Sequence, residues 1–434
     1  MKENALLLVA GTALLILCYF GAMGTGKADF VRFVPLELLQ GALFAFASLL
    51  AFKSADRRTT LIIVLAFGIL FRAVVLPSAP FASTDIYRYV WDGRVIAAGI
   101  NPYAYVPADK HLADLRDGAI YPSINRRSTA LTIYPPVAQA AFFVGSRLGG
   151  VFAMKALMTG CDVASMLVLM RLLALSGAPV QRIILYAWHP LIIWEFAGNG
   201  HIDALAIALI CIAFFAYRFD RRFILGAALG AATLVKFLPV VLFAPLYRRW
   251  DWKMPLTFGI VAALAYAPFL SVGTRVLGYL PGYAHEEGID SGRRFYLLNL
   301  VHSAFRFDVP PVLYIVLGAL MIGALWLLSQ RIDPVRVETR QMFALLIAAT
   351  ITILLSPAYP WYFTWLVPLC VLSNSRAVLY LTLLAPLLYL RELFDSAPLV
   401  LVVDTIVFVP AMFVAIRTIL YERRALFAML GAYA

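Results

Sequence analysis

The chain has 434 residues, of which 63% are hydrophobic and 14% charged, and its formal net charge is +12. Apolar runs of about twenty residues follow one another along it, which excludes a soluble globular protein. Lipid offers the backbone no hydrogen-bond partners, so the runs predict an all-α, polytopic helical membrane protein. The basic residues form small clusters between the runs rather than one stripe, which indicates membrane orientation and not nucleic-acid binding.

The apolar runs predict about 12 to 14 membrane-spanning helices, and we treat residues 1–434 as a single transmembrane domain. The first run has only Lys2 before it and no convincing cleavage site after it, so we interpret it as a retained span and not as a signal peptide. Arginine clusters flank residues 223–247 on both sides, so two short helices meeting near Lys236 and Pro239 fit better than one crossing. The other expected spans are 5–23, 34–52, 60–76, 151–173, 182–197, 203–219, 254–271, 310–330, 341–356, 361–374, 377–391 and 399–417.

Two long segments fall outside the membrane when the basic clusters are placed in the cytoplasm, and both termini then lie inside. The first outer segment is 77–150. Its run YPPVAQAAFFVGSRLGG is too short for a confident span, so it predicts a helix lying at the outer interface. The second outer segment is 272–310.

A short polar helix is predicted at residues 85–98, with Ser83 or Thr84 as its N-cap. Four side chains at helical spacing share one face of it: Asp85, Arg88, Tyr89 and Asp92. Asp85 could simply offset the helix dipole while Arg88 pairs with Asp92. Alternatively, one of the two carboxylates is a general base, because partial desolvation at the interface raises its basicity.

Ionisable side chains inside apolar runs are costly and are therefore functional candidates. Glu195 lies in one such run, and Lys236 lies in the predicted hairpin. Lys236 could pair with Glu195 or with a backbone carbonyl, or it could contact a phosphate. The turn NGHID, which contains Asn199, His201 and Asp203, could open the next helix or orient a sugar. A shared metal is a third option for His201 and Asp203, although two ligands are a weak metal signal.

Two further groups of residues, predicted to lie at the outer face, each have a structural and a functional interpretation. Arg293 and Arg294 are either solvated loop charges or bidentate phosphate contacts. Tyr359 and Trp361, in SPAYPWYFTWLVP, belong either to an aromatic belt at the membrane boundary or to a surface for a sugar ring or a prenyl chain.

Several motifs in a fixed order carry a resemblance to a known family. They are DIYRYVWDGRVIAAGINPYAY, IYPPVAQ, HPLIIWEFAGNGHIDALAIAL, the lysine in LVKFLPVVLFAPL, and SPAYPWYFTWLVP. This order resembles the GT-C superfamily of membrane glycosyltransferases. Within the superfamily, the chain is similar to bacterial polyprenyl-phosphate-mannose-dependent mannosyltransferases, over residues 60–369.

The resemblance implies a GT-C-like multi-pass protein of the inner membrane with its active site facing the periplasm. It implies a polyprenyl-phosphate-linked sugar donor, a lipid or glycan acceptor, contact with membrane lipid, and inverting transfer without a cofactor or metal. It implies Asp85 as the general base, with Asp92 as the competitor. The expected substrate contacts are Arg88, Tyr89, Asn101, Tyr134, Glu195, Asn199, His201, Asp203, Lys236, Arg293, Arg294, Tyr359 and Trp361.

Two other functions remain open from the sequence. A transporter or lipid flippase would use Glu195, His189 and Lys236 as a proton or substrate relay. A polymerase or ligase would use a pyrophosphate-linked glycan.

Overall fold

A computed structural model describes residues 2–24, 29–331, 336–394 and 396–431. Every regular element in these ranges is a helix. Eight of the helices described are long and apolar enough to cross a membrane, which confirms a polytopic helical membrane protein. They are α1 (Lys2–Gly24), α2 (Phe30–Lys53), α3 (Arg57–Val75), α6 (Gly150–Leu175), the stretch Lys253–Glu286, α15 (Pro311–Gln330), α16 (Val337–Leu355) and α19 (Ala397–Gly431, apolar to Arg417). The stretch Lys253–Glu286 comprises α12 (Lys253–Tyr266), the 3-10 helix η6 (Ala267–Leu277) and α13 (Leu280–Glu286).

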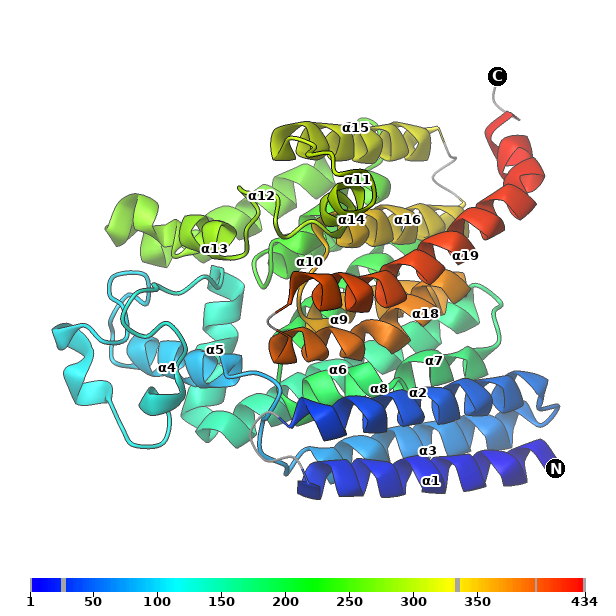
Figure 1. Ribbon diagram of the computed structural model, residues 1–434, viewed down its shortest axis with the longest axis horizontal. Coiled ribbons are helices and arrows are strands. Elements are labelled where there is room, and N and C mark those ends of the chain that lie inside the picture. The colour runs from blue at the N-terminus through cyan, green and yellow to red at the C-terminus, as the bar shows by residue number, and fades with distance from the viewer. Residues whose placement is uncertain (1, 25–28, 332–335, 395, 432–434) are drawn as a thin grey trace.

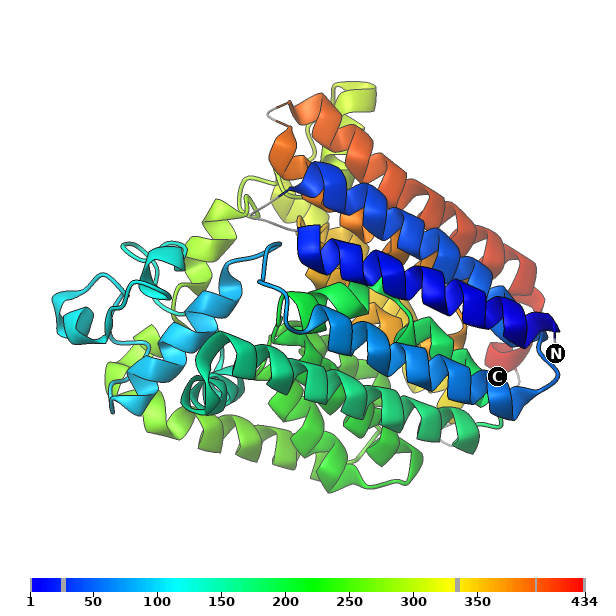
Figure 2. The same cartoon turned by 90° about the horizontal axis from the view of Figure 1, so that it is seen from below.

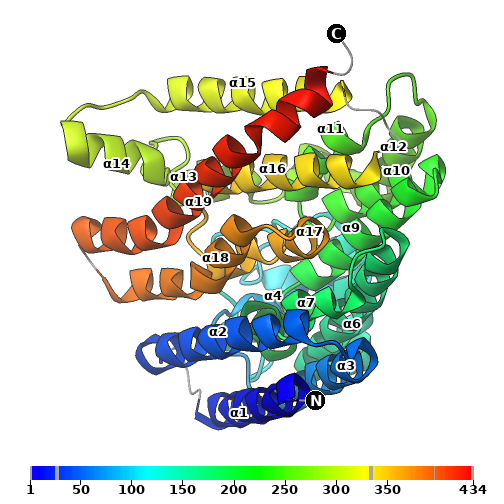
Figure 3. The same cartoon turned by 90° about the vertical axis from the view of Figure 1, so that its right-hand side faces the viewer.

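The long helices lie side by side in one bundle (Figure 1). α1 packs against α2 and α3 on one flank, while α15 packs against α16 on the opposite flank (Figure 3). The outward faces of these flanks carry exposed apolar side chains such as Val9, Phe20 and Leu320. Such a surface suits lipid and not water.

The remaining predicted spans are made of shorter, broken helices. Proline near the start of several of them, such as Pro190 and Pro360, removes a backbone donor and interrupts the helix. Irregular backbone is tolerated at membrane depth where protein surrounds it, and every residue from 183 to 204 is buried. The pieces are η3 (Val180–Ile183), α7 (Ile184–Ala187), α8 (Pro190–Ile192), the π-helix η4 (Ile193–Gly198), α9 (Asp203–Arg218), η7 (Pro360–Phe363), α17 (Leu366–Ser373), α18 (Arg376–Leu384) and η8 (Ala385–Leu393).

The hairpin predicted for 223–247 is confirmed. α10 (Arg222–Thr233) ends before Lys236, and the chain continues as η5 (Leu238–Leu242) and α11 (Phe243–Leu246). Lys236 therefore lies in the break between two helical pieces, where its side chain is not held on a regular helix face.

Both outer segments lie at the same end of the bundle. Figure 1 shows α4, α5 and α13 together at the end opposite to the start of α1, and Figure 2 shows the start of α1 far from the segment that contains α4. The link between α2 and α3 carries the basic residues Lys53, Arg57 and Arg58. Ser54 in this link donates a hydrogen bond to Asn4 Oδ1 at 3.0 Å, so the link lies at the end of the bundle where α1 begins. The two outer segments and this basic link therefore lie at opposite ends of the bundle, as the sequence predicts. The compartment that each end faces stays a prediction.

The first outer segment contains both predicted helices, α4 (Asp85–Ala97) and α5 (Pro136–Leu148). They pack closely because Gly93 has no side chain where the backbone carbonyl of Phe142 approaches it. Thr84 is the N-cap of α4 and makes no side-chain capping bond, while Ser83 Oγ accepts the backbone N–H of Asp85 at 3.1 Å. α4 also packs on α6, which fixes this segment to the bundle. The other short helices outside the bundle core are η1 (Lys110–Leu115), η2 (Tyr121–Ser123) and α14 (Tyr296–Phe305).

Candidate active site

A cavity of about 440 Å³ lies between the bundle and the two outer segments. Its volume is in the range of small-molecule sites in proteins. The start of α4, the turn before α5, the Lys236 break, α13 and η7 all contribute to its wall. Its charged lining residues are Asp85, Arg88, Arg126, Lys236, Glu287 and Glu392, and its apolar and aromatic lining includes Phe30, Phe81, Tyr134, Phe237, Leu238, Tyr283, Tyr359, Trp361 and Tyr362.

Asp85 stands at the N-terminus of α4 with its carboxylate on the cavity wall. Its Oδ2 accepts a hydrogen bond from the Tyr134 hydroxyl at 3.1 Å, and its Oδ1 accepts one from Asn125 Nδ2 at 3.3 Å. Burial raises the pKa of the Tyr134 phenol, and the negative charge of Asp85 adds to this effect. Tyr134 therefore keeps its proton and remains a donor to the carboxylate. Both donors are neutral, so they orient Asp85 without neutralising it.

Asp92 lies behind the cavity wall and is only 2% exposed. Its Oδ1 accepts a hydrogen bond from Arg88 Nε at 2.8 Å, and its Oδ2 accepts one from Gln139 Nε2 at 3.3 Å. Tyr89 is also buried, and its ring stacks on Phe142 at 4.5 Å. Of the four side chains predicted to share a face, only Asp85 and Arg88 reach the cavity. Asp92 holds Arg88 at the wall.

Lys236 reaches the cavity from the break in the hairpin. Its Nζ lies 2.9 Å from Asp203 Oδ1 and 4.5 Å from the centre of the Tyr362 ring. Pairing of Lys236 with Glu195, one of the sequence alternatives, is therefore wrong, because the carboxylate beside the ammonium is that of Asp203. Phe237 and Leu238 follow Lys236 on the same wall, so the cation lies next to an apolar strip.

The aromatic residues of the last motif form a flat surface on the cavity wall. Tyr359 and Trp361 stack with ring centres 4.4 Å apart and an angle of 7°. The hydroxyl of Tyr283, from α13, lies 2.7 Å from that of Tyr362. Trp361 is only 6% exposed and its ring also lies 4.5 Å from that of His201, so the face that this pair offers to a sugar ring is that of Tyr359.

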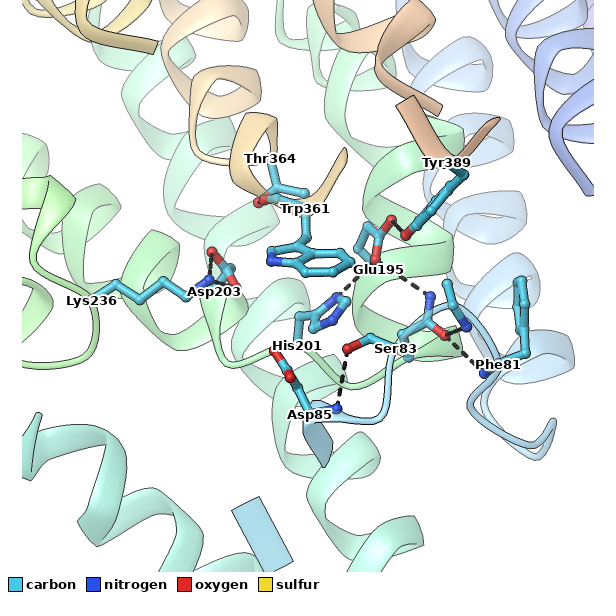
Figure 4. Close-up of polar contacts among 12 residues, drawn as sticks. Phe81, Ser83, Asp85, Glu195, His201, Asp203, Lys236, Trp361, Thr364 and Tyr389 are labelled. Carbon is cyan, nitrogen blue, oxygen red and sulfur yellow. Dashed lines mark hydrogen bonds and ion pairs between the residues drawn. The ribbon is translucent and has the colours of Figure 1, made fainter. Parts of the chain in front are cut away.

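Besides Tyr89 and Asp203, four predicted substrate contacts line neither this cavity nor the one beside it. Glu195, Asn199 and His201 are buried behind it, and Figure 4 shows His201 beneath Trp361 with Glu195 beyond it. Asn101 donates its amide hydrogens to Phe269 O and Ser271 Oγ, both at 3.1 Å. These side chains make protein contacts in this structure.

The two loop arginines line a neighbouring cavity of about 360 Å³. Arg294 is paired with Glu287, while Arg293 Nε donates to Ser291 Oγ at 3.1 Å. This second cavity shares Arg126, Glu287 and Tyr359 with the first, so the two are adjacent. Arg293 and Arg294 are therefore near the candidate active site without lining its main cavity.

His201 and Asp203 have separate partners. His201 Nδ1 lies 2.8 Å from Glu195 Oε2, and Asp203 binds Lys236. Among the residues that the structure describes, no three histidine, cysteine, aspartate or glutamate side chains gather as a metal site requires. His201 and Asp203 of the NGHID turn therefore contact different residues, Glu195 and Lys236.

Sequence reasoning missed several residues of the cavity wall, among them Asn125, Arg126 and Tyr283. They lie in irregular segments or at helix ends, where no periodic pattern marks the side that faces a ligand. The available signal was the gathering of polar and aromatic residues in the two outer segments, which points to a region and not to particular residues.

A family model described as Alpha-(1->6)-mannopyranosyltransferase, N-terminal domain, matches residues 7–250, more than half of the chain. The chain belongs to this mannosyltransferase family. It is a glycosyltransferase with a sugar donor and a glycan acceptor, as the GT-C resemblance implies. The matched range includes Asp85, Asp203 and Lys236, whereas η7 and the second outer segment follow it. No curated protein and no solved structure matches the chain.

Proposed function

We propose that this protein moves mannose, or another hexose, from a polyprenyl-phosphate donor to a lipid or glycan acceptor at the periplasmic face of the inner membrane. One observation carries the proposal: the carboxylate of Asp85 lies on the wall of a cavity that also presents Lys236 and the stacked Tyr359–Trp361 pair. A base, a cation and an apolar sugar platform are thereby present in one space.

The residues fit a single displacement. The acceptor hydroxyl oxygen attacks the anomeric carbon, Asp85 takes the hydroxyl proton, and the bond from that carbon to the phosphate oxygen breaks with inversion. Lys236 stabilises the negative charge on the departing polyprenyl phosphate. Since prenyl phosphate is a good leaving group, no second acid is needed.

The surroundings of Lys236 favour a lipid-linked phosphate. Phe237 and Leu238 adjoin the ammonium group, and Phe30, at the start of α2, also lines the cavity. A donor phosphate beside Lys236 could extend its chain along these apolar side chains. Arg293 and Arg294 in the adjoining cavity would add positive charge close to the phosphate.

The orientation rests on charge. The cavity lies at the bundle end that carries the long outer segments, while Lys53, Arg57 and Arg58 flank the link at the other end. Basic links favour the cytoplasmic side of a membrane. The cavity then opens toward the periplasm.

The direct test is transfer by the protein purified in detergent, with synthetic polyprenyl-phosphate mannose as donor and octyl α-mannoside as acceptor. Asp85→Asn should lower transfer by about 10²-fold or more, since proton removal is lost. The matched control is Asp114→Asn, an exposed carboxylate in the same outer segment, which should behave like the unchanged protein. Near-normal transfer by Asp85→Asn would refute Asp85 as base. Use of a polyprenyl-pyrophosphate donor alone would favour the polymerase or ligase alternative.

A further inference from the structure

A buried carboxylate behind the cavity receives three side-chain contacts. Glu195, in the π-helix η4, accepts a hydrogen bond from the Tyr389 hydroxyl at 2.6 Å on Oε1. Its Oε2 lies 2.8 Å from His201 Nδ1 and 3.4 Å from Asn199 Nδ2 (Figure 4). The Tyr389 hydroxyl and the Asn199 amide donate to Glu195, and His201 Nδ1 donates to it in the tautomer that carries the ring proton on this nitrogen.

Asn199 connects this carboxylate to the segment that ends at Asp85. Its Oδ1 accepts the backbone N–H groups of Phe81 and Ala82, at 3.2 and 3.1 Å. Both residues are buried and line the cavity. Ser83 follows them, and its hydroxyl oxygen accepts the backbone N–H of Asp85. The position of the candidate base therefore depends on a short irregular segment whose backbone is held by the amide of Asn199.

His201 connects the same carboxylate to the aromatic platform. Its ring centre lies 4.5 Å from that of Trp361, which stacks on Tyr359. Gly200 lies between Asn199 and His201 in the chain and has a left-handed φ of 71°. A Cβ added there would lie 2.6 Å from Ile86 Cδ1 of α4, so the turn presses directly against the helix of the base.

We propose that Glu195 and Asn199 are positioning residues for the transfer reaction. Glu195 orients the amide of Asn199 so that its oxygen fixes the backbone of Phe81 and Ala82, and Asp85 is thereby placed on the cavity wall. Through His201 the same carboxylate supports Trp361, so one buried group sets the distance between base and sugar platform. This role needs no contact with substrate, and it rests on the proposed function of Asp85.

The first test is Asn199→Ala in the purified full-length protein, assayed with polyprenyl-phosphate mannose and octyl α-mannoside. A misplaced base should lower kcat about 10- to 100-fold, while KM for the donor should stay within about threefold, because Asn199 does not contact the donor. The matched control is Asn4→Ala, whose Oδ1 also accepts two hydrogen bonds, from Ser54 at 3.0 Å and Thr60 at 2.7 Å, at the far end of the bundle. A kcat for Asn199→Ala equal to that of the control overturns the inference.

The second test exchanges donor and acceptor. Asn199→Asp places two carboxylates side by side and removes the donor to Glu195, so kcat should fall. Adding Glu195→Gln restores one donor and one acceptor at this contact, and neutral His201 can change tautomer to accept from the new amide. The double variant should recover at least about tenfold in kcat over Asn199→Asp. A double variant no faster than Asn199→Asp refutes the positioning role.

Failure of this inference can be distinguished from failure of the proposed function. If Asp85→Asn is inactive and Asn199→Ala is normal, only the positioning role is wrong. If Asp85→Asn retains transfer, the assignment of the base is wrong and the positioning role falls with it.

Discussion

Asp85 and Asp92, which the sequence leaves as competitors, should respond to amide substitution in opposite ways. Asp92→Asn removes one charge of a buried pair whose side chains are 7% and 2% exposed, and it leaves the Arg88 guanidinium unpaired. Loss of one partner of a buried pair costs about 3–5 kcal/mol. Within the part of the chain that the structure describes, the Asp85 carboxylate accepts two long hydrogen bonds, both from neutral donors. Such bonds contribute about 0.5–1.5 kcal/mol each, and an amide oxygen can still accept one of them.

The assay combines melting and transfer in the same detergent. Asp92→Asn should melt well below the unchanged protein, and its folded fraction should retain more transfer than Asp85→Asn, because Asp92 does not reach the cavity and acts there only by holding Arg88. Asp85→Asn should melt close to the unchanged protein and lose transfer. The double variant Arg88→Met/Asp92→Leu removes both charges and should melt above Asp92→Asn.

The reasoning fails if the two phenotypes are exchanged. An Asp92→Asn protein that melts normally but no longer transfers sugar would make Asp92 the base. A large loss of melting temperature in Asp85→Asn would show that its contacts stabilise the fold to a degree that 3.1 and 3.3 Å hydrogen bonds do not explain.

Three further results are expected. Lys236→Gln should raise KM for the donor about tenfold or more in initial-rate assays, because a charged contact to phosphate is lost; an unchanged KM would remove Lys236 from the donor site. Trp361→Ala should raise the same KM about tenfold and Trp361→Phe distinctly less, since the Trp361 ring supports the Tyr359 ring that faces the sugar; equal effects would contradict this support. Gly200→Ala should lower the melting temperature more than Gly99→Ala, because both glycines have a left-handed φ but only Gly200 lacks space for a Cβ; equal losses would show that crowding at Gly200 is unimportant.

Local features of the sequence determined the helices of this protein. Run length and proline breaks predict where helices begin and end, because lipid leaves the backbone no alternative to internal hydrogen bonds. The polar helix expected at 85–98 is found at Asp85–Ala97, and the hairpin over 223–247 breaks at Lys236. The clustering of polar and aromatic residues in two outer segments also indicated the end of the bundle where the cavity lies.

Only the tertiary structure decided which of these side chains face the cavity. Helical spacing placed Asp85 and Asp92 on one face of the helix. In the structure, Gln139 of α5 covers Asp92, whereas Asp85 stays on the cavity wall. Lys236 pairs with Asp203, and Asp85 accepts a hydrogen bond from Asn125, 40 residues further along the chain. A periodic pattern shows that a helix has a polar side, but it does not show which neighbouring segment that side meets. That choice depends on how the helices pack, and packing here separates the proposed base from the carboxylate that holds Arg88.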